Sequence, residues 1–284
     1  MKIYSLVDNV SNGQLVAEHG LSLFIKLDNG TNVLFDMGQS DLFAENAERL
    51  GLNIADVDIA VISHGHSDHG GGLETFLKLN SKATVYIHRK AFEPHYSLKH
   101  EGLKYIGLNP TILSSELTRD RLMLTHNLRI ISEDMILFSN VEKTICFSPA
   151  NRLLYGADKV SNDDFVHEQN LLIRENGCWT LFAGCAHCGM VNIVKKAVEI
   201  IAEPPKYVYG GIHLMKNGLD AESENVFIKD LCQQLMDIPD TVYYTMHCTG
   251  MDAFMKMKEY MNDRIEYFNT IGDFVTIDNY FRSP

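Results

Sequence analysis

The chain has 284 residues, 45% of them hydrophobic, and a formal net charge of −12 at pH 7. This length supports a large buried core, and the acidic charge disfavours general binding to nucleic-acid backbones while still allowing a local basic pocket for a small phosphate. Six cysteines are too few for a disulfide scaffold. The sequence shows neither an apolar run of the roughly 18 residues that a membrane span needs nor an apolar N-terminal stretch of signal-peptide length. We therefore expect a soluble, cytoplasmic protein with no membrane or nucleic-acid partner.

The first part of the chain predicts strands that lead into a helix. Apolar and alternating runs favour strands over 2–7, 19–27 and 32–36. Asp28-Asn29-Gly30 is a hairpin signal between the second and third of these strands. Helical spacing follows over 42–50, so this part of the chain is typical of an α/β protein.

A histidine-rich tract follows an apolar run over 57–62 that reads as a buried strand. The tract is Ser-His-Gly-His-Ser-Asp-His over 63–69, and after three glycines a helix is expected over 73–79. A polar cluster between a strand and a helix is where α/β proteins place their sites. A solvated histidine-rich loop is the alternative interpretation, and the buried strand before the tract disfavours it.

The spacing within the tract favours metal binding. His64 and His66 alternate, so on an extended segment both rings point to the same side and can hold one ion. Asp68 and His69 follow after a further turn and can face a second ion. Imidazole nitrogen and carboxylate oxygen are ligands of borderline divalent ions, zinc above all, with iron or manganese as alternatives.

The middle of the chain is less regular. After a strand expected over 83–88, the segment 89–164 contains only short strand-like runs such as 128–131, and we interpret it as an insertion that caps the site. Its lone histidines are expected to be structural or to face a substrate on a loop rather than to bind metal. They are His95, His100 and His126.

Three strand ends in the second half each offer another histidine. A hairpin over 171–183 leads to His187, and strands within 207–214 and 241–250 lead to His213 and His247. If the last strand continues with period 2, His247 and Cys248 face opposite sides, and we expect His247 to be the ligand. The other elements expected here are helices over 191–201, 221–236 and 253–261 and a last strand over 274–277.

The motif His64-x-His66-x-Asp68-His69 resembles the signature of the metallo-β-lactamase-fold hydrolases. The resemblance implies an α/β fold, a four-layer αββα sandwich in one domain over 1–284. It also implies that Asp36, at the end of a strand, orients a ligand rather than touching metal.

Three later segments are similar to one branch of that superfamily. The branch includes 7,8-dihydropterin-6-yl-methyl-4-(β-D-ribofuranosyl)aminobenzene 5′-phosphate synthase, and its likeness also covers residues 164–169. It implies a metal-dependent enzyme acting on a small phosphorylated or pterin-like molecule, by hydrolysis or by condensation with loss of diphosphate. The three segments are Gly184-Cys185-Ala186-His187, Gly210-Gly211-Ile212-His213-Leu214 and His247-Cys248-Thr249-Gly250.

The sequence departs from the superfamily pattern at one position. Many members carry a bridging Asp at the end of the strand that here precedes Gly184, whereas this chain has Cys185. A thiolate could bind metal there, or Cys185 could be inert while His187 supplies the ligand, which is the interpretation we favour. The missing Asp leaves the number of ions open between one and two.

Together the motifs and the resemblance define an expected site. Asp68 would also orient the nucleophile, and His213 would support a ligand or contact substrate, so these two are the expected catalytic residues. A hydrolase of the wider superfamily (lactonase, thioesterase or phosphodiesterase) and a non-enzymatic metal- or ligand-binding protein are the alternatives. The expected ligands are His64, His66 and His187 for one ion and Asp68, His69 and His247 for the other.

Overall fold

The computed structural model describes residues 1–284 except 12, 14, 216–217, 269–273 and 277–284. Two seven-stranded sheets lie at its centre. The first has the order β17-β1-β2-β3-β4-β5-β8. Its strands are β1 (Lys2–Val7), β2 (Ser22–Lys26), β3 (Asn32–Phe35), β4 (Ile59–Ile62), β5 (Thr84–His88), β8 (Leu122–Thr125) and β17 (Phe274–Thr276). The last residue of the strand predicted over 274–277 lies outside the described residues.

The second sheet has the order β16-β15-β14-β13-β12-β10-β9. Its strands are β9 (Leu128–Ser132), β10 (Met135–Ser139), β12 (Gln169–Glu175), β13 (Cys178–Phe182), β14 (Tyr207–Gly210), β15 (Val242–Thr245) and β16 (Ile265–Tyr267). In both sheets the strands that precede predicted site residues run parallel to one another. Their carboxyl ends therefore meet at one edge of each sheet, where α/β proteins bind ligands.

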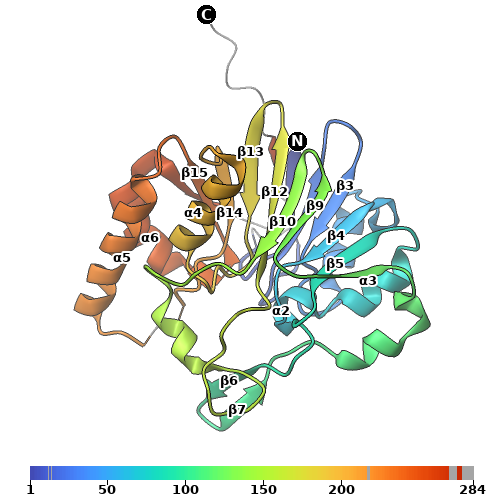
Figure 1. The fold of residues 1–284 in the computed structure, drawn as a ribbon, viewed down its shortest axis with the longest axis horizontal. Coiled ribbons are helices and arrows are strands. Elements are labelled where there is room, and N and C mark those ends of the chain that lie inside the picture. Colours follow the sequence, from blue (N-terminus) through green and yellow to red (C-terminus); the bar gives the residue numbers. More distant parts are fainter. Residues whose placement is uncertain (12, 14, 216–217, 269–273, 277–284) are drawn as a thin grey trace, which may run out of the picture.

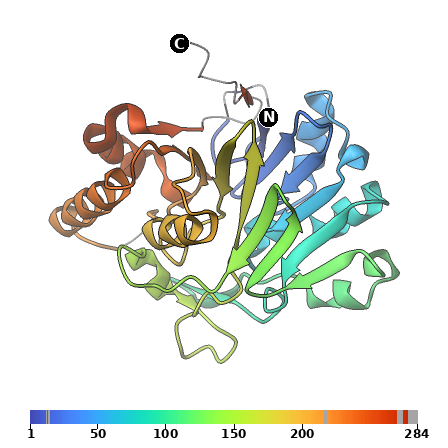
Figure 2. The ribbon, with the colours of Figure 1, turned by 45° about the horizontal axis from the view of Figure 1, so that its top comes forward.

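Helices cover the outer faces of both sheets, which gives four layers. Figures 1 and 2 show α4–α6 on one side of the sheets and α3 on the other. Residues of α1 and α3, such as Phe43 and Phe76, share a buried cluster with Leu34 and Ile62 of the first sheet. The helices are α1 (Leu42–Arg49), α2 (Ser67–Gly70), α3 (Leu73–Leu79), α4 (Met190–Ile201), α5 (Ala221–Met236) and α6 (Met251–Met261).

The central strands are apolar on both faces because each face is buried. In β3, Leu34 packs toward the helices while Phe35 packs into the cluster between the sheets. Phe35 meets Phe182 of the second sheet there, with ring centroids 6.0 Å apart. This explains why these strands read as continuous apolar runs rather than as alternating ones.

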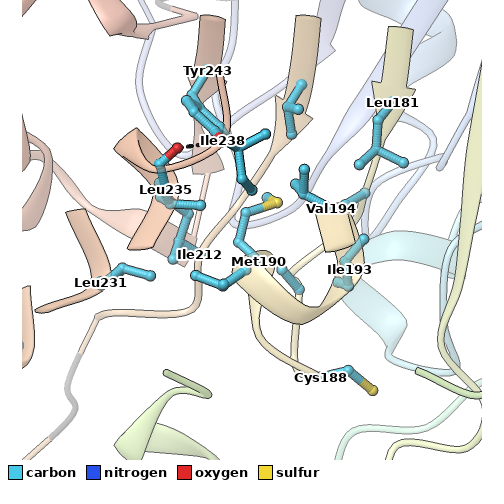
Figure 3. Packing of buried hydrophobic residues seen from close by; sticks show 14 of the residues in the cluster. Leu181, Cys188, Met190, Ile193, Val194, Ile212, Leu231, Leu235, Ile238 and Tyr243 are labelled. Carbon is cyan, nitrogen blue, oxygen red and sulfur yellow. Dashed lines mark hydrogen bonds between the residues drawn. The ribbon is translucent and has the colours of Figure 1, made fainter. Parts of the chain in front are cut away.

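The outer face of the second sheet packs against α4 and α5 (Figure 3). Leu181 lies beside Val194 of α4, and Tyr243 of β15 reaches α5, where its hydroxyl donates a hydrogen bond to the Leu235 carbonyl at 3.0 Å. Burying large apolar side chains in this way stabilises the layer by about 1.5–3 kcal/mol for each. The rigid layer fixes the strand ends that carry the site.

The expectation that 89–164 is a capping insertion is wrong for part of that segment. β8 extends the first sheet, and β9 and β10 form the edge of the second. Because most of β9 is exposed at that edge, its sequence lacks the apolar alternation that marks a half-buried strand. Only β6 (Tyr96–Lys99), β7 (Gly102–Tyr105) and β11 (Leu154–Tyr155) form a separate small sheet, and Figure 1 shows the β6–β7 hairpin at the lower edge of the molecule.

Candidate metal centre

The histidine-rich tract packs against the backbone of several neighbouring loops. A Cβ atom on Gly65 would lie 2.4 Å from the Ala91 carbonyl oxygen, and one on Gly71 would lie 2.3 Å from that of Gln39. Gly71 has an ordinary helical φ of −61°. Glycine is therefore required at these positions by the lack of space for a side chain.

Two residues of the first predicted ligand set, His64 and His66, lie together at the end of β4. His64 Nε2 and His66 Nδ1 are 3.0 Å apart. One ligand atom from each of His64, Cys185 and His187 lies within 4.8 Å of the others. The second ring nitrogen of two of these histidines is held in place, at 2.9 Å from Ser63 Oγ for His64 and 2.9 Å from Asn151 Oδ1 for His187. These bonds aim both Nε2 atoms at one position.

The three histidines of this set are buried, and burial favours the neutral form of an imidazole. Burial lowers the pKa of His64, His66 and His187 well below the ordinary range, and neighbouring imidazoles lower it further. A neutral imidazole offers the lone pair that a metal needs. His187 Nε2 is buried and, among the described residues, has no hydrogen-bond partner. A buried atom of this kind is costly unless something binds it.

The second predicted set lies beside the first. Asp68 Oδ2 is 3.8 Å from His69 Nε2 and 3.5 Å from His247 Nε2. Asp36 accepts a hydrogen bond from His69 Nδ1 at 2.7 Å, and Asn9 Oδ1 lies 2.8 Å from His247 Nδ1. The outer nitrogens of His69 and His247 are thus fixed, and their inner nitrogens face the centre. The Asp36 contact is the geometry that the resemblance implied for that carboxylate.

Cys185 lies between the two sets. Its Sγ atom is 3.1 Å from His69 Nε2. It belongs to three candidate ligand groups, one with His64 and His187, one with His69 and His247, and one with His213 and Cys248. The sequence left open whether Cys185 or His187 binds metal, and the structure brings both to the centre. The buried thiol at this place is therefore close to residues of both predicted sets.

The turn that follows β15 corrects one sequence-based argument. The strand ends at Thr245, and His247–Thr249 form a 3-10 turn. His247 has a φ of 46°, so the backbone no longer alternates as in a strand, and both His247 and Cys248 are buried near the centre. Cys248 Sγ accepts a hydrogen bond from the His213 backbone N–H at 3.2 Å and forms a third candidate group with Cys185 and His213.

Residues of the run over 164–169 hold two parts of the site together through hydrogen bonds. Glu168 accepts hydrogen bonds from the backbone N–H groups of His187 at 2.6 Å and Cys188 at 2.9 Å. The Gln169 side-chain amide donates to the Ile62 carbonyl at 2.7 Å. These contacts fix the His187 loop against the end of β4.

Sequence reasoning missed several groups near the centre. His19 Nε2 lies 3.2 Å from Asp68 Oδ2, and Asp8 accepts a 2.7 Å hydrogen bond from the His247 backbone N–H. Asp8 and Asn9 follow β1, so the pattern of polar residues after a buried strand could have found them. His19 lies in a loop without such a signal. The three lone histidines of 89–164 differ in burial. His95 is buried beside His66, whereas His100 and His126 are exposed.

A pocket of about 540 Å³ opens over both ligand sets. Asp68, Cys185 and His213 line its floor, and the β6–β7 hairpin forms part of its wall. Lys99 and Lys104 of that hairpin line the pocket as well. The candidate ligand groups are thus accessible from solvent to a small molecule.

This chain is similar to several known proteins. The family model described as the metallo-beta-lactamase superfamily matches residues 16–139. An uncharacterized protein of Methanocaldococcus jannaschii is 30% identical over 271 residues, which cover 90% of this chain and 94% of that protein. This chain belongs to the metallo-β-lactamase superfamily. The superfamily that the sequence predicted is confirmed.

Further relatives of this metallo-β-lactamase-superfamily protein share its full length. A Methanocaldococcus jannaschii protein named 7,8-dihydropterin-6-methyl-4-(beta-D-ribofuranosyl)-aminobenzene-5′-phosphate synthase is 27% identical over 278 residues, covering 93% of this chain and 92% of that protein. A crystal structure of a metal-dependent hydrolase of the β-lactamase superfamily has a TM-score of 0.77 at 26% identity and covers 98% of this chain and 100% of its own. The predicted fold class is confirmed by this likeness. Within the described residues, none of the helices is long and apolar enough to cross a membrane.

Replacing His64 and His66 together by alanine should abolish stoichiometric metal binding, because it removes two buried imidazoles that face one position. Elemental analysis of protein purified without added metal measures the result. His126→Ala, at an exposed histidine, is the matched control and should keep full metal content. Full metal content in the double variant would show that the ions bind elsewhere.

His247→Ala should lose one metal equivalent, whereas Cys248→Ser should keep both, if two are bound. The physical reason is that His247 Nε2 is buried without a hydrogen-bond partner among the described residues, while Cys248 Sγ already accepts the His213 N–H. Metal titration of the two purified variants distinguishes them. Loss of metal from Cys248→Ser alone would make the thiolate the ligand.

Proposed function

We propose that this chain is a metal-dependent enzyme that acts on a small phosphorylated, pterin-like molecule, by hydrolysis or by condensation with loss of diphosphate. The observation that carries the proposal is one pocket that joins a cluster of buried metal-binding side chains to two lysines on its wall. The relative named as a dihydropterin-linked phosphate synthase supports the same substrate class.

The residues of the centre fit a divalent transition metal. Imidazole nitrogens dominate, with one carboxylate and one thiol, a donor set that suits zinc better than magnesium or calcium. His187 Nε2 and His247 Nε2 are buried without hydrogen-bond partners in the described part of the chain, as expected of ligand atoms. The proposed ligands are His64, His66 and His187 for one ion and Asp68, His69 and His247 for a second, with Cys185 between them.

When bound, such an ion lowers the pKa of its water to about 7 and polarises a phosphoryl oxygen. The chain contributes the rest. Burial alone would raise the pKa of Asp68, but the imidazoles of His69, His19 and His247 hold it well below its usual range. Asp68 therefore stays ionised beside the pocket and can orient a nucleophile, and His213 lines the same floor and can contact the substrate.

Lys99 and Lys104 provide the phosphate-binding groups of this proposal. In the antiparallel β6–β7 pair Ser97 stands opposite Lys104, so these two side chains share a face, and Lys99, two residues beyond Ser97, shares it as well. Both lysines are exposed, and within the described ranges neither forms an ion pair. In a chain with a net charge of −12, two unpaired cations beside the pocket favour an anionic substrate.

A hydrolase of the wider superfamily, such as a phosphodiesterase, thioesterase or lactonase, is the second candidate. The structural neighbour described as a metal-dependent hydrolase favours it. The two candidates differ in whether a phosphate group is needed for recognition, and the lysines offer a direct test.

Lys99→Ala and Lys104→Ala should each weaken the binding of inorganic diphosphate to the zinc-loaded protein by roughly tenfold, because each removes one charged hydrogen-bond donor. Isothermal titration calorimetry measures the change. Lys78→Ala on α3 is the control, since that lysine pairs with Glu74 at 2.7 Å and does not line the pocket. Unchanged binding in both variants would contradict the phosphate role and, together with turnover of lactones or thioesters in a substrate screen, favour the second candidate.

A further inference from the structure

The two ring nitrogens of His66 have different surroundings. Its Nδ1 atom is the one near His64 Nε2, at 3.0 Å, and so faces the first metal position. Its Nε2 atom points away, is buried, and has no hydrogen-bond partner among the described residues. A neutral imidazole that binds metal through Nδ1 carries its proton on Nε2. That proton needs an acceptor in the protein interior.

The neighbouring side chains form a buried cluster outside both ligand sets. His95, Asp163 and His167 are at most 7% exposed. His95 Nδ1 lies 2.7 Å and His167 Nε2 lies 3.2 Å from the same oxygen, Asp163 Oδ2. The other carboxylate oxygen of Asp163 accepts the Phe165 backbone N–H at 2.8 Å.

The hydrogen bonds of this cluster determine where its protons lie. The Gly65 backbone N–H donates to His167 Nδ1 at 2.9 Å, so His167 carries its proton on Nε2 and donates it to Asp163. Asp163 accepts from His95 Nδ1 in the same way. A neutral His95 then has its lone pair on Nε2, which is buried and has no hydrogen-bond partner in the described part of the chain.

The two unpartnered nitrogens belong to adjacent rings. The ring centroids of His66 and His95 are 5.6 Å apart, and one ligand atom from each of His66, His95, Asp163 and His167 lies within 4.8 Å of the others. One Nε2 bears a proton when His66 binds metal, and the other bears a lone pair. The Nε2 atoms of His66 and His95 are therefore complementary as hydrogen-bond donor and acceptor.

We propose that His95, oriented by Asp163, accepts the Nε2 proton of His66 and thereby holds His66 as an Nδ1 metal ligand. This inference rests on the proposed metal site and adds two positioning residues to it. Carboxylate–histidine partners of this kind raise the basicity of a ligand and fix its tautomer, and their loss typically costs 10–100-fold in metal affinity.

The same four residues are unsuited to hold an ion of their own in this arrangement. His167 Nδ1 already accepts an N–H, so its Nε2 is protonated and unable to bind metal. Asp163 Oδ2 already accepts two N–H groups. The cluster therefore supports a ligand rather than forming a third metal site.

The test measures zinc affinity by competition with a chelator, in variants chosen to separate hydrogen bonding from packing. His95→Leu removes the acceptor and should weaken zinc binding by about 10–100-fold. His95→Gln keeps an acceptor for His66 and a donor for Asp163, and should restore most of the affinity. Asp163→Asn should lower the zinc affinity as much as His95→Leu does. The asparagine amide can donate to His95 Nδ1, which places the His95 proton on Nε2, opposite the proton of His66.

The thermal midpoint of each metal-free variant checks its folding, and His100→Ala is the exposed-histidine control. Should His95→Leu not fold, the contrast between His95→Gln and Asp163→Asn decides, since both keep polar side chains of nearly the original size. Equal zinc affinity in Asp163→Asn, His95→Gln and the parent protein would overturn the inference.

Two further results distinguish this inference from others. An additional zinc equivalent in the parent protein that is lost only in the His95 and Asp163 variants would show a third metal site and overturn the positioning role. His66→Ala is measured in parallel. If His66→Ala, as well as the His95 and Asp163 variants, leaves the zinc affinity unchanged, the proposed metal centre is wrong, and not merely the role of His95.

Discussion

The site depends on the buried carboxylate of Asp36. Asp36 accepts hydrogen bonds from the Ser63 backbone N–H, the Ser63 hydroxyl and His69 Nδ1, each at 2.7 Å. It adopts a φ of 60°, a backbone conformation that a non-glycine residue rarely takes. This one side chain ties the end of β3 to the end of β4 and sets the orientation of a predicted ligand. A buried carboxylate with every oxygen satisfied is stable there, and it would be costly with any partner removed.

The same principle recurs around the whole centre. Besides His69, three of the inward-facing imidazoles have the outer nitrogen bound to a neighbour, Ser63 for His64, Asn151 for His187 and Asn9 for His247. The partners come from loops that follow different strands. The ends of the parallel strands therefore carry the candidate ligands, and partners that include residues of separate loops, such as Asn9 and Asn151, orient them. Asn151, His95 and Asp163 all lie in the segment over 89–164. This segment therefore helps to position the candidate ligands as well as covering part of the site.

Sequence reasoning was most successful where local pattern and chemistry coincide. The tract over 63–69 and the three later strand ends were recognisable because an apolar strand followed by polar residues has one common structural meaning in α/β proteins. The partners of these residues were harder to find. His95 and Asp163 are 68 positions apart, and nothing in either segment indicates that they meet. The His247–Cys248 argument failed because β15 ends two residues before His247, and strand ends are the least predictable part of an element.

The contact between Asn9 and His247 joins residues 238 positions apart. The centre thus takes shape only when the end of the first strand and the end of β15 have been brought together, a contact of the high sequence separation that slows folding. During synthesis, an emerging chain would hold the HxHxDH loop long before the groups that complete the second ligand set exist. An ion bound to the finished centre stabilises the native state by mass action. In the proposed centre, an ion held by His247 together with Asp68 and His69 would therefore link residues from the two halves of the molecule.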